Sequence, residues 1–232
     1  MSWQTNPVTI KARSFARSLG LTRIVGKLLQ GDRYEEAFDD AMFAAIGPDD
    51  IIWDIGANIG YYSKKFADAA GSGGKVFAFE PFPETIKRLN ASIEGYDNII
   101  VVPMALGSEG GMVRMQDGGD DLGATNKIVG TDASEGFTEV EAITGDVLVA
   151  RGDAERPNLL KIDTEGFELD VLEGIKGLLG ETGLRALFIE VHFGNLAERG
   201  MAHAPARIEQ ILLASGYRLR WLDPSHLAAY RK

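Results

Sequence analysis

The stretch from Ile51 to Ser63 reads IIWDIGANIGYYS, and it decides the fold. Its apolar run ends around Asp54, Gly56 and Gly60 follow, and a helical pattern then begins at once. This order is typical of a buried parallel strand that turns sharply into a helix. The two glycines permit a tight turn and a close approach of a ligand to the backbone. The stretch therefore predicts an α/β fold with a ligand site at this turn.

The spacing within the turn separates two classes of cofactor. The pattern is G-x-N-x-G, so Asn58 stands where a dinucleotide-binding turn has its second glycine. Asp54 is expected to project a carboxylate into the crevice, where it suits a cationic group better than a diphosphate. The first N–H groups of the helix can hold a polar or anionic group. These features favour the amino-acid end of S-adenosylmethionine over NAD. The expected contacts are Asp54, Gly56, Ala57, Asn58, Gly60 and Ser63.

Composition limits the other possibilities. The chain has 232 residues, of which 45% are hydrophobic, which suffices for one α/β domain. It contains no cysteine, so disulfides, thiolate metal sites and a cysteine nucleophile are excluded. A formal net charge of -10 argues against a nucleic-acid partner. Because the sequence shows neither a membrane span nor a secretory signal, a cytoplasmic protein is expected.

The N-terminal region differs in charge from the rest of the chain. Residues 1–31 contain basic side chains and no acidic one. We expect residues 1–46 to form a helical segment that packs on or caps the domain formed by residues 47–232, with a clear amphipathic helix at Tyr34–Ile46. Two alternatives are that the basic residues dock an acidic carrier or partner, and that the segment resembles an organelle-targeting segment.

The next two strands complete the predicted cofactor site. Lys75–Glu80 is an apolar strand that ends in an acid, and Glu80 lies twenty positions beyond Gly60. That is close to where a dinucleotide fold places the acid that binds the ribose hydroxyls. Pro81 and Phe82 follow directly and are expected beside it. The strand Asn98–Met104 leads to Ala105 and Leu106, which are expected to cover an adenine ring.

A second group of polar residues lies at Asn158–Glu168, which reads NLLKIDTEGFE. The strand predicted there places Asp163 and Glu165 at its carboxyl end, facing the same crevice. Two carboxylates so close can bind a metal or a cation, or raise each other's pKa for proton abstraction. Lys161 is expected to be a salt-bridge partner that points to the opposite side of the strand.

The last strands add histidines to this edge. Arg185–His192 is expected to be a strand that places Glu190 and His192 at this edge. The terminal hairpin is expected to place His226 and Asp223 there. Segment 193–204 is expected to cover the acceptor site, where the substrate that receives a group from the cofactor would bind. Residues 117–137 are expected to be a mobile loop, Thr138–Thr144 an edge strand, and Phe167–Leu179 a helix. A general base can be His192, His226, Asp163 or Glu165, and the sequence does not choose among them.

Several motifs resemble one known family. DIGANIGYYS at 54–63, FEP at 79–81, KIDTEGFE at 161–168 and WLDPSHLAA at 221–229 resemble the FkbM-type S-adenosylmethionine-dependent methyltransferases, over about Glu35 to the C-terminus. The family more often has Val in place of Thr164. The resemblance implies a Rossmann-like class I methyltransferase fold, with helices on both faces of a seven-stranded, mostly parallel sheet whose last strand is antiparallel.

The resemblance also implies an activity. It implies transfer of the sulfonium methyl of S-adenosylmethionine to a hydroxyl oxygen of a sugar or small natural product. By motif position, Asp54, Gly56, Asn58 and Gly60 would hold the methionyl part and Glu80 the ribose, with Asp163 and Glu165 beside the methyl group.

Other functions stay open at this point. A nicotinamide oxidoreductase would need the missing glycine, and a non-catalytic cofactor- or partner-binding domain would not need Asp163. Asp163, Glu165 and Glu190 could also bind Mg²⁺, although a metal-free site is the favoured interpretation.

Overall fold

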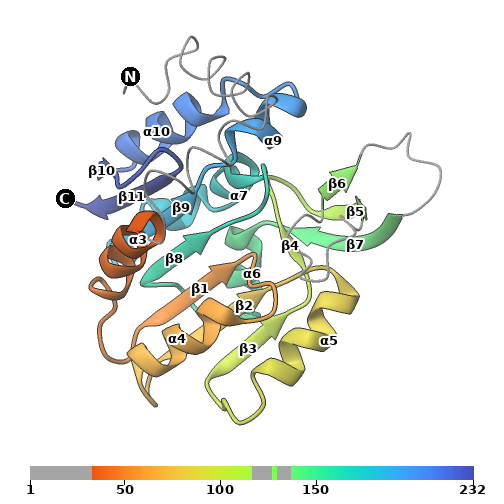
Figure 1. Cartoon of the computed structure of the whole chain (residues 1–232), viewed down its shortest axis with the longest axis vertical. Helices are drawn as coiled ribbons and strands as arrows, with labels where there is room; N and C mark the ends of the chain where they lie inside the picture. The colour runs from red at the N-terminus through yellow and green to blue at the C-terminus, as the bar shows by residue number, and fades with distance from the viewer. Residues whose placement is uncertain (1–32, 117–126, 130–136) are drawn as a thin grey trace.

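The core of the protein is a seven-stranded sheet (Figure 1). The computed structural model describes residues 33–116, 127–129 and 137–232. The strand order is β10-β11-β9-β8-β1-β2-β3, and β11 is antiparallel to both of its neighbours, whereas the other pairings are parallel. The predicted topology is therefore confirmed. The strands are β1 (Ile51–Ile55), β2 (Lys75–Phe79), β3 (Ile99–Val102), β8 (Leu159–Ile162), β9 (Ala186–Glu190), β10 (Tyr217–Trp221) and β11 (His226–Arg231).

Helices cover both faces of this sheet, because its central strands carry apolar side chains on both sides. In β1, Ile52 and Trp53 are both fully buried and belong to different core clusters. The cluster around Ile52 includes side chains of α3 (Arg33–Phe43), α4 (Tyr61–Ala70) and α5 (Pro83–Ser92). The cluster around Trp53 includes those of α6 (Gly145–Arg151), α7 (Glu168–Gly174), α8 (Lys176–Leu179), α9 (Phe193–Glu198) and α10 (Ala204–Ala214).

A second, smaller sheet was not predicted. It has four strands in the order β4-β7-β5-β6, and Figure 1 shows it beside the main sheet. The strands are β4 (Ala105–Leu106), β5 (Gly111–Gln116), β6 (Lys127–Val129) and β7 (Phe137–Ile143). Two expectations are corrected here. The span 117–137 contains a strand, and β7 lies between β4 and β5 rather than at an edge, because both of its sides are paired. The rest of that span lies outside the described residues.

The N-terminal helix α3 packs on the main sheet. Its Phe38 and Met42 are buried, and the ring of Phe38 contacts those of Phe188 and His226. The first part of the predicted helical segment, residues 1–32 with their basic side chains, lies outside the described residues. Among the described helices, none has the length and apolar character needed to cross a membrane.

One predicted helix is interrupted. The span Phe167–Leu179 forms α7 and α8, which are separated at Ile175. Next to this break, Gly174 lies so close to Gly107 that a Cβ atom would stand 1.9 Å from the carbonyl oxygen of Gly107. The helix is therefore interrupted beside the point where the backbone of α7 contacts the residues after β4. Helical periodicity in the sequence does not indicate such a contact between distant segments.

Candidate active site

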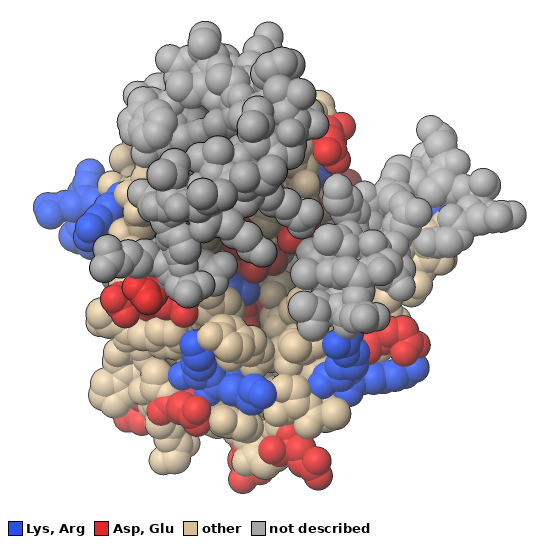
Figure 2. All heavy atoms as spheres, viewed as in Figure 1, with Lys and Arg blue, Asp and Glu red and all other residues tan. Residues whose placement is uncertain are grey.

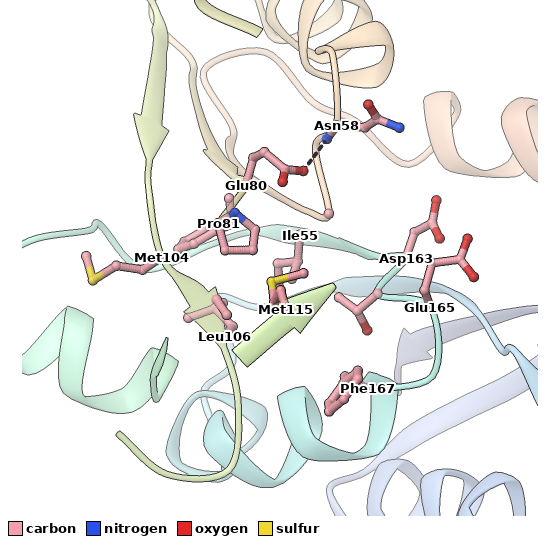
Figure 3. A pocket seen from close by; sticks show the side chains of 14 residues that line it. Ile55, Asn58, Glu80, Pro81, Met104, Leu106, Met115, Asp163, Glu165 and Phe167 are labelled. Atoms are coloured by element: carbon pink, nitrogen blue, oxygen red, sulfur yellow. Dashed lines mark hydrogen bonds between the residues drawn. The ribbon is translucent and has the colours of Figure 1, made fainter. Parts of the chain in front are cut away.

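A cleft opens at the carboxyl ends of β1, β2 and β8 (Figure 3). Open α/β sheets bind ligands at this edge. The predicted residues that line the cleft are Gly56, Asn58, Glu80, Pro81, Ala105, Leu106, Asp163 and Glu165. The lining residues that the sequence analysis did not propose as contacts are Ile55, Phe79, Met104, Met115, Thr164 and Phe167. Most of these are apolar. Met115 comes from the small sheet, which was not predicted, so the motifs around β1 and β8 could not have indicated that it lines the cleft.

Glu80 stands at one side of the cleft and is held by two backbone N–H groups. Asn58 N donates to its Oε2 at 3.1 Å, and Phe82 N donates to its Oε1 at 3.0 Å. The residue is only 7% exposed. Burial raises the pKa of Glu80 to about 7, against the opposing effect of the two N–H groups. The carboxylate is therefore fixed in place at the position predicted for a ribose-binding acid.

The turn after β1 has the tight backbone that its sequence predicts. Gly56 has φ 81°, Asn58 φ 51° and Gly60 φ 83°, all in the left-handed region. Gly56 lies directly against the turn after β8, where a Cβ atom would stand 1.8 Å from the carbonyl oxygen of Asp163. The two turns that carry the strongest motifs are thus in backbone contact.

Several predicted cofactor contacts do not line this cleft. Asp54 is completely buried, its Oδ2 accepts a hydrogen bond from Ser63 Oγ at 2.6 Å, and its Oδ1 lies 3.2 Å from Lys161 Nζ. The expectation that Asp54 projects into the crevice is therefore wrong in this structure, because its carboxylate turns inward to buried partners. Ala57, Gly60, Ser63 and Phe82 are also buried and are not among the described residues that line the cleft.

Lys161 is the main polar residue that the sequence analysis misplaced. Its ammonium lies 3.4 Å from Asp163 Oδ2, donates to the carbonyl of Gly56 at 3.3 Å and stands over the ring of Tyr62. Burial alone would lower the pKa of Lys161, but Asp54 and Asp163 raise it above its ordinary value. The predicted salt bridge exists, yet Lys161 faces both acids rather than pointing away. It joins the turns after β1 and β8.

At the acidic end of the cleft, Asp163 and Glu165 lie close to Glu190 and His192, two predicted catalytic residues that are not among the described residues lining the cleft. His192 Nε2 lies 3.7 Å from Asp163 Oδ1, 3.5 Å from Glu165 Oε2 and 3.7 Å from Glu190 Oε1. Figure 3 shows the carboxylates of Asp163 and Glu165 pointing the same way. Desolvation raises the pKa of Glu165, with Asp163 and Glu190 adding to the shift. Two strand ends, those of β8 and β9, therefore supply one cluster of ionisable groups.

Further side chains hold this cluster in position. The buried Glu168 contacts His192 Nδ1 at 2.7 Å, and Asn195 Nδ2 donates to Glu165 Oε2 at 2.7 Å. Burial would lower the pKa of His192, but the hydrogen bond to Glu168 and the nearby carboxylates raise it to about 9. Glu168 and Asn195 lie in segments that the sequence had assigned to this face, although their partners could not be read from spacing alone.

The other two histidines have different surroundings. His226 Nδ1 contacts Asp223 Oδ2 at 2.6 Å, and its Nε2 lies 3.5 Å from Glu190 Oε2. Burial would lower the pKa of His226, but Asp223 and Glu190 raise it to about 10. Burial would raise the pKa of Glu190, and the two histidines lower it. His203 is exposed just before α10, so it does not join this network.

The model of the methyltransferase FkbM domain matches residues 54–219, which contain the cleft motifs from Asp54 to Glu190. The chain belongs to the FkbM methyltransferase family. The resemblance seen in the motifs is therefore confirmed, and the class I methyltransferase fold with it.

One curated relative and two solved structures illustrate the match. The hexuronic acid methyltransferase AglP of Haloferax volcanii is 33% identical over 147 residues, which cover 63% of this chain and 57% of that protein. This chain thus spans little more than half the length of that relative. Aeropyrum pernix fibrillarin with bound S-adenosyl-L-methionine aligns with a TM-score of 0.50 and 14% identity, covering 84% of this chain and 75% of that one.

The second structure is the S-adenosylhomocysteine-bound methyltransferase PaMTH1 of Podospora anserina. It aligns with a TM-score of 0.51 and 9% identity, covering 100% of this chain and 89% of that one. At such low identity the two structures support the fold of the FkbM domain and not its substrate. Both share with this chain the class I architecture that was predicted.

Proposed function

We propose that the chain transfers a methyl group from S-adenosylmethionine to a hydroxyl oxygen, with a sugar as the acceptor. The observation that carries this proposal is the layout of the cleft in an FkbM domain. Glu80 lies at one side, Asp163 and Glu165 lie at another, and apolar side chains lie between them (Figure 3). A long donor with a polar nucleoside and a reactive sulfonium suits such a cleft.

The residues present fit this donor. The carboxylate of Glu80 can accept two hydrogen bonds from the vicinal hydroxyls of a ribose. Met104, Leu106 and Met115 form an apolar wall for a base. Thr164 Oγ1 and Asn58 Oδ1 are buried atoms of the lining that have no partner among the described residues, so a ligand can satisfy them. We place the methionyl part near Asn58 and the sulfonium near Asp163.

The chemistry proposed is an in-line displacement. The acceptor oxygen forms a bond to the methyl carbon, the carbon–sulfur bond breaks, and its electron pair stays on sulfur, which becomes a neutral thioether. The hydroxyl proton passes to a carboxylate at the acidic end, Asp163 or Glu165. Alignment of donor and acceptor in the cleft can supply roughly 7–11 kcal/mol of the barrier.

A saccharide acceptor is supported by two observations. The Haloferax relative is named for a hexuronic acid substrate. The net charge of -10 disfavours a polyanionic acceptor such as nucleic acid. On the described part of the face in Figure 2, Lys and Arg side chains lie among Asp and Glu side chains instead of gathering in one patch.

The nicotinamide alternative is not favoured. The turn after β1 has Asn58 in place of the second glycine, and the chain matches a methyltransferase domain. A domain that only binds the cofactor would retain its function when Asp163 is replaced.

A transfer assay separates these functions. The full chain is incubated with S-adenosylmethionine labelled in the methyl group and with a panel of neutral sugars and uronic acids. We expect the label to appear in an alkali-stable methyl ether of one class of sugar. We also expect the rate to fall at least tenfold for Asp163→Asn, which keeps the shape of the side chain. Label in no saccharide contradicts the saccharide acceptor. An Asp163→Asn rate equal to that of the unchanged chain contradicts the proposed role of the acidic end.

A further inference from the structure

The acidic end of the cleft contains a set of groups suited to a metal ion. One ligand atom each from Asp163, Glu165 and His192 lies within 4.8 Å of the others. The three residues come from the segments after β8 and β9, so the fold itself, and not a single loop, brings them together. All three are partly buried.

The distances between these atoms match ligands around one ion better than direct hydrogen bonds. His192 Nε2 lies 3.7 Å from Asp163 Oδ1 and 3.5 Å from Glu165 Oε2, whereas a charge-assisted N–H···O bond spans about 2.7–2.9 Å. Ligand atoms each about 2.1 Å from a common ion stand about 3.4 Å apart in a tetrahedral arrangement. The three atoms thus leave room between them for an ion at bonding distance.

A second observation, independent of the cluster itself, is the support of the histidine. Glu168 is completely buried, and its Oε1 lies 2.7 Å from His192 Nδ1, which directs Nε2 toward Asp163 and Glu165. Metal-binding histidines commonly have a carboxylate on the second ring nitrogen. The other oxygen of this fully buried carboxylate, Oε2, has no hydrogen-bond partner among the described residues. Glu165 is also held in place, because Asn195 Nδ2 donates a hydrogen bond to its Oε2 at 2.7 Å.

We propose that Asp163, Glu165 and His192 bind one divalent cation at the acceptor end of the cleft. Two carboxylate oxygens and one imidazole suit Mn²⁺ and related ions with mixed oxygen and nitrogen ligands. Three protein ligands leave positions open for water or substrate. This site departs from the metal-free interpretation favoured by the sequence.

The role of the ion rests on the proposed function. An acceptor hydroxyl that binds the ion in an open position would lose its proton more readily, as metal-bound water does. The binding site itself does not depend on that role, and the experiment below measures binding without turnover.

The experiment titrates Mn²⁺ into the full chain after treatment with EDTA and removal of the chelator, and it follows free Mn²⁺ by electron paramagnetic resonance. We expect saturation at one ion per chain, and at least tenfold weaker binding for Glu165→Gln and His192→Gln. The matched controls are Glu94→Gln and His203→Gln, two exposed residues outside the cleft, which should bind Mn²⁺ like the unchanged chain. Melting temperatures show whether each variant is folded.

A second readout needs no variant with an altered site. The chain has three histidines, so substoichiometric Mn²⁺ should broaden the ring signals of His192 strongly and leave those of His203 sharp in an NMR spectrum. The proposal is overturned if Mn²⁺ does not bind, if both site variants bind it as the controls do, or if the signals of His192 stay sharp. Titration of S-adenosylhomocysteine in the presence of EDTA tests the donor site separately, so failure of the metal site and failure of the proposed function are distinguishable.

Discussion

Single residues set the backbone geometry of the cleft, and Gly56 is the most constrained of them. Its φ of 81° and its contact with the backbone of Asp163 leave no room for a side chain. We predict that Gly56→Ala costs about 1–2 kcal/mol for the left-handed backbone and roughly 1–3 kcal/mol more for the clash. Urea unfolding measures the sum.

Gly152→Ala is the matched control for this prediction. Gly152 has a similar φ of 79° in the left-handed region, but a Cβ atom there meets nothing within 4 Å. It should therefore cost only the backbone part, about 1–2 kcal/mol. Equal costs for the two variants would show that the contact between the two turns does not constrain the fold.

Glu80 makes the stability of the protein depend on pH. Burial raises its pKa from 4.5 to about 7, so the stability it contributes is fully present below about pH 4.5 and is lost as pH rises through 7. Between pH 8 and pH 5, we predict that the free energy of unfolding of the unchanged chain rises by roughly 2–3 kcal/mol relative to Glu80→Gln. Chemical unfolding at both pH values gives this double difference.

The exposed Glu94→Gln provides the reference, because the effects of all other titrating groups cancel in each comparison. A Glu80→Gln difference that changes with pH no more than the Glu94→Gln difference would mean that the carboxyl group of Glu80 is not desolvated as its position indicates.

At the scale of elements, Lys161 links the ends of β1 and β8. The residue is 3% exposed, and its side chain contacts Asp54, Asp163 and the carbonyl of Gly56. Removal of the ammonium would leave the buried carboxylate of Asp54 without its cation. We predict that Lys161→Met destabilises the fold by about 3–5 kcal/mol, as measured by urea unfolding.

Lys75→Met is the control, since Lys75 is an exposed lysine that pairs with Glu155 at the surface. It should change the free energy of unfolding by no more than about 1 kcal/mol. A similarly small effect for Lys161→Met would show that this lysine does not hold the two turns together.

The main elements were predictable from sequence because each carries a strong local signal. The apolar strands β1, β2, β8 and β9 and the glycine turn after β1 were indicated, and β11 was predicted as an antiparallel last strand. The small sheet was not: a strand was predicted at Thr138–Thr144, but its pairing with β4 and β5 joins separate segments, which no local pattern indicates. The break at Ile175 was missed because it coincides with a contact between Gly174 and Gly107, distant in sequence.

At the scale of the whole molecule, the sequence predicted which residues gather at the carboxyl edge of the sheet. Glu80, Asp163, Glu165 and His192 all lie there. The direction of each side chain was harder to predict, because it depends on packing between segments far apart in the chain. Asp54 turns inward to Ser63, and the support of His192 by Glu168 arises only when β9 lies beside β8.

We propose that this edge of the sheet forms one donor site in which Glu80 binds the ribose of S-adenosylmethionine. The decisive measurement is isothermal titration of S-adenosylhomocysteine into the full chain with EDTA present. We expect one molecule to bind per chain, with affinity about 100-fold weaker in Glu80→Ala, because two charge-assisted hydrogen bonds are lost, and unchanged in Glu94→Gln. Absence of binding to the unchanged chain, or equal affinity of Glu80→Ala, would contradict it.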